Sequence, residues 1–178
     1  MTDNSFNSIY YEDGCFHKVD SIDSESTALL VIDLQKTYTK LGKTDETIRF
    51  KEFNQRLFST VIPNTKKLLC EFRNRKMQVI YCRIASHLKN GKDRSLSQKL
   101  EGWNCTLLFK DDYDSQIIDS IAPLSEEIVL AKTTDSALSG SNLRLTLNNL
   151  SIKTVVCAGI FSDQCVSSTV RSLSDSAS

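Results

Sequence analysis

Four apolar runs divide the chain into alternating buried and amphipathic segments. The first run, Ala28–Ile32, is stopped by Asp33, and the others lie in MQVIYCR (77–83), EEIVLAK (126–132) and KTVVCAG (153–159). Short unbroken apolar runs of this kind are typical of strands that are buried on both faces of a parallel sheet. The pattern therefore predicts four parallel strands.

Amphipathic and polar segments lie between the predicted strands. Residues 44–76 have a helical pattern in which Pro63 opens a second segment. The stretch 84–114 is polar, with few periodic features and a turn signal at NGK, so we predict a long loop. Further helices are predicted near 115–121, over GSNLRLTLNNL (140–150) and from about Gln164 onward.

The alternation of strands and helices predicts an α/β fold. Parallel strands joined by helices require right-handed crossovers, so helices should cover both faces of one parallel sheet in a Rossmann-like, three-layer arrangement. We expect a single domain over 1–178, with residues 1–25 forming an irregular polar segment before the first strand.

Composition narrows the range of partners. Of the 178 residues, 22 are Lys or Arg and 22 are Asp or Glu, so the formal net charge is zero. Without a basic surplus to attract phosphates, neither nucleic acid nor an anionic membrane is expected to bind, and a small-molecule substrate is favoured. No segment resembles a secretory signal or a membrane span, so we expect a soluble, cytoplasmic protein.

The six cysteines are expected to be reduced, because a chain of this size with many regular elements does not need disulfides. No C-x-x-C pair occurs, and His17 and His87 are the only histidines. A zinc site would have to be assembled from scattered residues, so neither a metal nor another cofactor is predicted.

Three chemically complementary residues follow the predicted strands. Asp33 ends the first strand, Lys132 ends the third, and Cys165 follows the fourth after a short turn. Because ligands bind beyond the carboxyl ends of the strands in an open parallel sheet, these side chains are expected to meet there. Taken singly, each has a plainer interpretation: Cys165 as a small buried residue, Asp33 as a cap and Lys132 as a surface charge.

Taken together, the three residues indicate a hydrolase. Formation of a thiolate is promoted by a cation, a helix N-terminus or a base. Lys132 would be the cation, the helix that begins near Gln164 would offer its N-terminus, and Asp33 would be the base. Cys165 would attack a carbonyl or carbamoyl carbon, and N–H groups of the turn GIFSDQC (159–165) would stabilise the oxyanion. Asp33 would protonate the leaving nitrogen and then activate water.

Three segments carry a resemblance to a known family. ALLVIDLQ, VLAKTTDSALSGSNLRLTL and VVCAGIFSDQCVSSTVRS are similar, in order and spacing, to the signatures of the isochorismatase-like cysteine hydrolases. The resemblance implies that Asp33 is the general base, Lys132 the catalytic lysine and Cys165 the nucleophile. It also implies a cis peptide between Ile160 and Phe161 and an oxyanion hole formed by the backbone N–H groups of Phe161 and Cys165.

Within that family the residues favour an amidohydrolase. True isochorismatases lack the cysteine, and nicotinamidases carry an Asp and His metal-binding segment where this chain has only His87 in a different pattern. The segments around the second strand, the nucleophile and the N-terminus look most like the branch that includes ureidoacrylate amidohydrolase and related carbamoyl or biuret-type hydrolases. The resemblance thus implies cleavage of a C–N bond in a small amide, carbamoyl or ureido compound through a cysteine thioester.

Several polar and aromatic residues are further substrate-binding candidates. The glutamines among them would either hydrogen-bond a substrate amide or stabilise turns. The basic residues would either bind a substrate carboxylate or remain solvated. The tryptophan would either line the pocket or pack beneath the long loop. These candidates are Gln35, Gln164, Arg83, Lys92, Arg94 and Trp103.

The chain departs from the family at its C-terminal side. Members usually continue past the nucleophile helix into another strand and a closing helix, whereas this chain ends at SLSDSAS. We therefore expect the sheet to lack its last strand and helix and to expose a long edge. A non-catalytic, oligomerising member of the family is the alternative to an enzyme, and a homo-oligomer is expected in either case.

Overall fold

The computed structural model describes residues 21–40, 48–101 and 106–176. Its centre is one sheet of four parallel strands in the order β3-β2-β1-β4. This confirms the predicted α/β class and the four predicted strands. Their bounds are β1 Thr27–Ile32, β2 Gln78–Ile84, β3 Ile128–Lys132 and β4 Thr154–Gly159.

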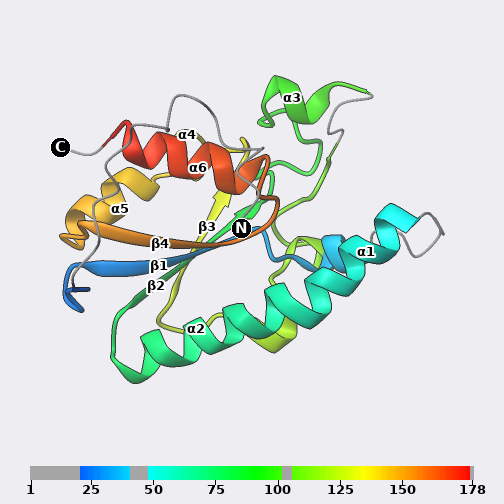
Figure 1. The fold of residues 1–178 in the computed structure, drawn as a ribbon. Coiled ribbons are helices and arrows are strands. Elements are labelled where there is room, and N and C mark those ends of the chain that lie inside the picture. The colour runs from blue at the N-terminus through cyan, green and yellow to red at the C-terminus, as the bar shows by residue number, and fades with distance from the viewer. Residues whose placement is uncertain (1–20, 41–47, 102–105, 177–178) are drawn as a thin grey trace, which may run out of the picture.

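Helices cover both faces of the sheet, which gives the predicted three layers (Figure 1). One face carries a continuous helical segment, and Pro63 lies in the first turn of its second part, where a missing N–H is tolerated. The other face carries the helices that follow β3 and β4. The first layer consists of α1 Ile48–Arg56, the π-helical turn η3 Leu57–Val61 and α2 Ile62–Asn74, and the second of α4 Ala137–Gly140, α5 Leu143–Asn149 and α6 Cys165–Ser174.

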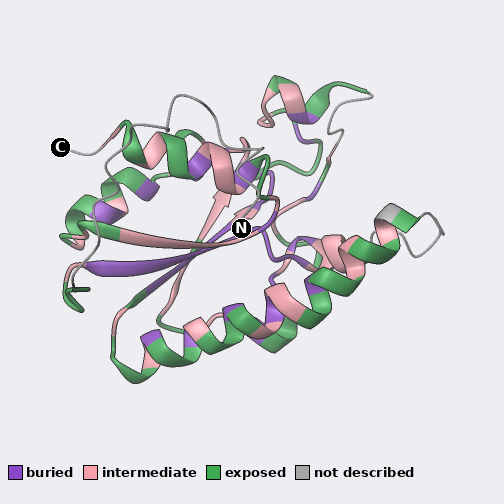
Figure 2. Ribbon diagram, in the orientation of Figure 1, coloured by how far each residue is buried: buried purple, intermediate pink, exposed green. Residues whose placement is uncertain are grey.

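Strand β1 lies at the centre of the core. All six of its residues are buried, because β2 and β4 flank it and helices cover its two faces (Figure 2). Alternate side chains point to opposite faces, so Leu30 and Ile32 pack toward α4–α6 while Leu29 and Val31 pack toward α2. The unbroken apolar run of the sequence is thus explained by burial on both sides.

Two segments between β2 and β3 differ from the prediction. Residues 115–121 do not form one α-helix, because Ile117 pairs with Gln35 in an isolated antiparallel bridge. That extended pairing leaves a 3-10 turn on each side of it, η4 Tyr113–Ser115 and η5 Asp119–Ile121. The predicted loop 84–114 contains one short helix, α3 Leu96–Lys99.

Strand β4 forms one edge of the sheet. Within the described ranges no strand pairs with its outer side, and Val155–Gly159 are only half-buried. The edge that the sequence led us to expect is therefore present in the described part of the fold. No helix in that part is long and apolar enough to cross a membrane.

Candidate active site

Strand register brings the three predicted residues to the same end of the sheet. Ile32 pairs with both Cys82 and Gly159, and Lys132 pairs with Ile84 at the end of β2. Asp33 follows Ile32 directly, and its N–H donates to the carbonyl of Cys82 at 2.9 Å. The backbone ladder thus positions a carboxylate, an ammonium and the turn that carries Cys165.

Asp33 and Lys132 form a buried ion pair. Nζ of Lys132 lies 2.8 Å from Oδ2 of Asp33, and both residues are 0% exposed. Burial raises the pKa of the Asp33 carboxyl, and the Lys132 charge offsets only part of that rise. Burial alone would lower the pKa of Lys132, but the Asp33 carboxylate and the Cys165 thiol together hold that pKa above its ordinary value. The lysine therefore stays charged beside a carboxylate that is a stronger base than usual.

Lys132 has one further partner, whereas the Asp33 carboxylate keeps free lone pairs. The lysine ammonium also donates to the carbonyl of Thr134 at 3.0 Å. Apart from the ion pair, neither carboxylate oxygen of Asp33 accepts a hydrogen bond of ordinary geometry from the described residues. Asp33 is thus free to take a proton from a neighbouring group.

Cys165 is that neighbour, since its thiol and the Asp33 carboxylate lie close enough to shift each other's pKa. It is the first residue of α6 and is buried, with 2% exposure. Burial first, and then the charge of Asp33, raises the pKa of the thiol well above its ordinary value. A thiol whose pKa is raised in this way keeps its proton at neutral pH, so attack by its sulfur requires a base.

The turn between β4 and α6 fixes the position of this thiol. The peptide between Ile160 and Phe161 is cis, as the family resemblance implied. The carbonyl of Phe161 accepts from the N–H groups of Gln164 and Val166 at 3.2 and 3.1 Å. Within the described ranges, the N–H groups of Phe161 and Cys165 donate to no backbone carbonyl and to no capping side chain.

A model of the isochorismatase domain matches residues 27–176 of this chain. The chain belongs to the isochorismatase family. This family match covers every strand of the described sheet and the turn that carries Cys165.

The curated relatives of this isochorismatase-family chain include distant ureido and carbamoyl amidases. It is 28% identical over 169 residues to the ureidoacrylate amidohydrolase RutB of Acinetobacter baylyi, covering 83% of this chain and 64% of that protein. It is 29% identical over 169 residues to the N-carbamoylsarcosine amidase of an Arthrobacter species, covering 92% of this chain and 59% of that protein. The chain thus spans less than two thirds of the length of these relatives.

Solved structures show the same fold for this family member. A cysteine hydrolase from Pseudomonas syringae superposes with a TM-score of 0.72 at 22% identity, covering 86% of this chain and 68% of that one. The N-carbamoylsarcosine amidase of Thermoplasma acidophilum gives a TM-score of 0.62 at 24% identity, covering 83% and 75% of the two chains.

The structure gives two of the substrate-binding candidates structural roles. Gln35 is 0% exposed. Its amide donates to the carbonyls of Ile84 and Ser115 and accepts from the Ile84 N–H, which is the turn-stabilising alternative. The guanidinium of Arg83 donates to Ser115 and to the carbonyl of Lys110, so it ties the loop after β2 to the sheet.

The remaining substrate-binding candidates lie in different parts of the chain and have different surroundings. Arg94 donates to three backbone carbonyls of its own loop, and the side chain of Lys92 is exposed. Gln164 is exposed at the N-cap of α6, beside the nucleophile, where it remains a candidate. Trp103 lies outside the described residues.

Two residues near Cys165 were not singled out from the sequence. Oδ1 of Asp135 lies 3.8 Å from Sγ of Cys165. Tyr38, in the 3-10 helix η2 Lys36–Lys40, packs edge-on against Phe161 with ring centroids 5.3 Å apart. Burial, followed by the charges of Asp33, Cys165 and Asp135, raises the pKa of the Tyr38 phenol. The position of Asp135, three residues after Lys132 in the same motif, was the one available signal.

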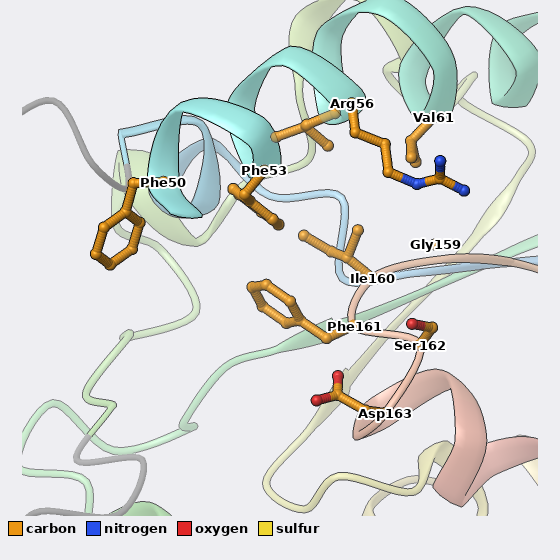
Figure 3. A pocket seen from close by; sticks show the side chains of 10 residues that line it. Phe50, Phe53, Arg56, Val61, Gly159, Ile160, Phe161, Ser162 and Asp163 are labelled. Carbon is orange, nitrogen blue, oxygen red and sulfur yellow. The ribbon is translucent and has the colours of Figure 1, made fainter. Parts of the chain in front are cut away.

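A cavity of about 780 Å³ is lined in part by residues 159–163 of the turn between β4 and α6. Phe53 and Phe161 line it and stack against each other with ring centroids 5.4 Å apart, and Asp163 also borders it (Figure 3). None of Asp33, Lys132 and Cys165 lines this cavity, so it is not the chamber in which the three groups meet. The described residues contain no group of three His, Cys, Asp or Glu side chains that could hold a metal ion.

Proposed function

We propose that this chain is an amidohydrolase that cleaves a C–N bond of a small amide, carbamoyl or ureido compound through a thioester on Cys165. The observation that carries this proposal is the contact among three groups at one end of the sheet. A buried carboxylate with free lone pairs, a buried ammonium and a neutral thiol are the acid–base set that covalent hydrolysis requires.

In the first half-reaction, the thiol proton of Cys165 passes to the carboxylate of Asp33 as sulfur attacks the substrate carbonyl carbon. The carbonyl electron pair moves to oxygen, and the free N–H groups of Phe161 and Cys165 stabilise that oxyanion. When the tetrahedral intermediate collapses, the C–N bond breaks and Asp33 returns the proton to the departing nitrogen. Ammonia or an amine leaves, and a thioester remains.

In the second half-reaction, Asp33 takes a proton from water as the water oxygen attacks the thioester carbon. The C–S bond breaks, the acid product leaves, and the proton on Asp33 returns to the thiolate. Lys132 stays protonated throughout and limits the negative charge that builds up around Asp33 and the sulfur. A free thiol and a carboxylate are restored without any other reagent.

The relatives support the substrate class. Proteins named for a ureido and for a carbamoyl compound match 83% and 92% of this chain. In both kinds of compound a carbonyl carbon is bonded to nitrogen, which is the bond that a cysteine nucleophile with a carboxylate base can cleave.

The proposal is tested by measuring ammonia release from ureidoacrylate, biuret, N-carbamoyl amino acids and nicotinamide. The chain as given is compared with Cys165→Ala and with Cys70→Ala, a matched control because Cys70 is an exposed cysteine far from the sheet end. Release that Cys165→Ala abolishes and Cys70→Ala leaves intact is the expected result. Release that survives Cys165→Ala would refute the thioester mechanism.

A second candidate is a non-catalytic protein that self-associates. It is favoured by the outer side of β4, which pairs with no strand of the described residues and whose backbone N–H and C=O groups are able to pair with a strand of a second copy. Silence across the panel from folded protein, together with a dimer in sedimentation, would favour this candidate. A monomer that turns over substrate would exclude it.

A further inference from the structure

The Cys165 thiol has a second carboxylate beside it that the mechanism above does not use. Oδ1 of Asp135 lies 3.8 Å from Sγ of Cys165, and Asp135 is half-buried. We propose that Asp135 sets the charge of the substrate, so that the compound cleaved at Cys165 is neutral or cationic and anions are rejected. This inference rests on the proposed function and narrows its substrate class to compounds without a negative charge. Of the panel above, biuret and nicotinamide should then be cleaved, whereas ureidoacrylate and N-carbamoyl amino acids, which are anions at neutral pH, should not.

The residues on both sides of Asp135 are held in place. The carbonyl of Thr134 accepts from Nζ of Lys132 at 3.0 Å. The hydroxyl of Ser136 lies 2.9 Å from that of Ser172, on the same helix as Cys165. Both sequence neighbours of Asp135 are thus held in place: Thr134 contacts the buried Lys132, and Ser136 contacts the helix that carries Cys165. These two contacts keep the backbone at Asp135 close to the helix that begins at Cys165.

The charge of Asp135 is not neutralised near the thiol. Among the described residues, the charged groups that act on Cys165 are Asp33, Lys132 and Asp135. Lys132 is already paired with Asp33 at 2.8 Å, so one negative charge remains next to the sulfur. The basic residue Arg83 gives its guanidinium to loop carbonyls. The formal charges of these three groups beside Cys165 therefore sum to one negative charge.

The chemistry of a carboxylate at this position favours one substrate class. Asp135 is able to accept hydrogen bonds from the N–H groups of a carbamoyl, ureido or amidine compound or to pair with a substrate cation. A substrate carboxylate brought close to Cys165 would face a like charge in a partly buried site, where repulsion is screened far less than in water.

The test compares two alkylating reagents of nearly equal size, neutral iodoacetamide and anionic iodoacetate, on the folded chain. The rates at Cys165 and at the exposed Cys70 are followed by mass spectrometry of their peptides, so that Cys70 serves as an internal reference. Because both reagents react with the thiolate, their rate ratio is independent of the thiolate fraction. Asp135→Asn removes the charge, and Asp175→Asn removes an exposed charge at the other end of α6.

In the unmodified chain, iodoacetate should be disfavoured at Cys165 relative to Cys70. Asp135→Asn should raise the ratio of the iodoacetate rate to the iodoacetamide rate at Cys165 by about tenfold, with no change in this ratio at Cys70. In Asp175→Asn the ratio should stay unchanged at both cysteines. An unchanged Cys165 ratio in Asp135→Asn would overturn the role of Asp135 and leave the proposed function standing. Failure of both reagents to reach Cys165 while Cys70 reacts would count against the proposed function itself.

Discussion

Nζ of Lys132 and Oδ2 of Asp33 are 2.8 Å apart, and neither residue has any solvent exposure. They come from different strands, β3 and β1, which are separated in the sheet by β2. A pair of this kind is costly to build, since both charges lose their hydration, and it is costly to break, since the remaining charge stays buried without its partner.

Breaking the pair should therefore be strongly destabilising. Lys132→Met and Asp33→Asn are each expected to lower the free energy of unfolding by about 3–5 kcal/mol, whereas the double variant should lose clearly less than the sum. Urea unfolding at neutral pH measures all three. In Lys132→Met the loss should shrink as the pH falls, because the unpaired Asp33 then takes up a proton in the folded state. Additive losses would show that the two groups are not coupled.

The pH profile of kcat/KM should be displaced at its acid side. The proposed mechanism needs the Asp33 carboxylate, and burial raises the pKa of that carboxyl above its ordinary value of 3.8. Activity should thus fall, as the pH drops, at a higher pH than for an exposed aspartate. The alkaline side should fall only above the ordinary thiol pKa of 9.0, because burial raises the pKa of Cys165. An acid midpoint at or below 3.8 would argue against Asp33 as the base.

Gly159→Ala should damage the nucleophile turn. Gly159 has a φ of +147°, and a Cβ added there would lie 2.1 Å from the carbonyl oxygen of Ile32, which also accepts from Ile160 N–H at 3.1 Å. That oxygen belongs to the central strand and cannot move aside, so we expect a loss of about 3 kcal/mol in the free energy of unfolding. Ser162→Ala, at an exposed position of the same turn, should change it by less than about 0.5 kcal/mol. Equal effects of the two variants in urea unfolding would contradict this account.

A pair remote from the active site gives a second stability prediction that depends on pH. Arg73 donates to both carboxylate oxygens of Glu127 at 2.8 Å. Burial alone would raise the pKa of Glu127, but the hydrogen bonds from Arg73 and from the Leu124 N–H bring it below its ordinary value of 4.5.

Glu127→Gln should therefore cost roughly 1–3 kcal/mol at neutral pH. Because the folded pKa is lowered, the contribution of the carboxylate is present above pH 4.5 and is lost as the pH falls through the folded pKa. Unfolding curves of the variant and the parent should converge in acid. A difference that is constant with pH would mean that the ionised carboxylate is not what stabilises the fold.

The strands and the convergence of three side chains were predictable from the sequence, because both depend on burial and on the direction of a parallel sheet. Asp33, Lys132 and Cys165 each follow an apolar run, and parallel strands place such positions at one edge. The 115–121 segment was not predictable in this way. Its isoleucines recur at helical spacing, but pairing of Ile117 with Gln35, far away in sequence, decides its conformation.

The side chains that surround the Cys165 thiol were equally unpredictable from the sequence. Tyr38 and Asp135 approach Cys165 only because separate segments fold against the same turn, and neither stands in an apolar run that marks its position. The roles of Gln35 and Arg83 were hidden in the same way. The sequence does not show which backbone carbonyls lie within hydrogen-bond distance of these side chains, and those carbonyls decide between substrate binding and loop support.

The in-register pairing of Ile32 with Gly159 has a consequence for how such a protein can diversify. Asp33, Lys132 and the turn that carries Cys165 each lie at or just after the end of a strand. The hydrogen bonds between the strands therefore fix the distances among them. The residue that we expect to choose the substrate, Asp135, lies instead in the connection between β3 and α4. Under the proposed function, exchange of side chains in such connections should change which compound is cleaved while the distances among Asp33, Lys132 and Cys165 are retained.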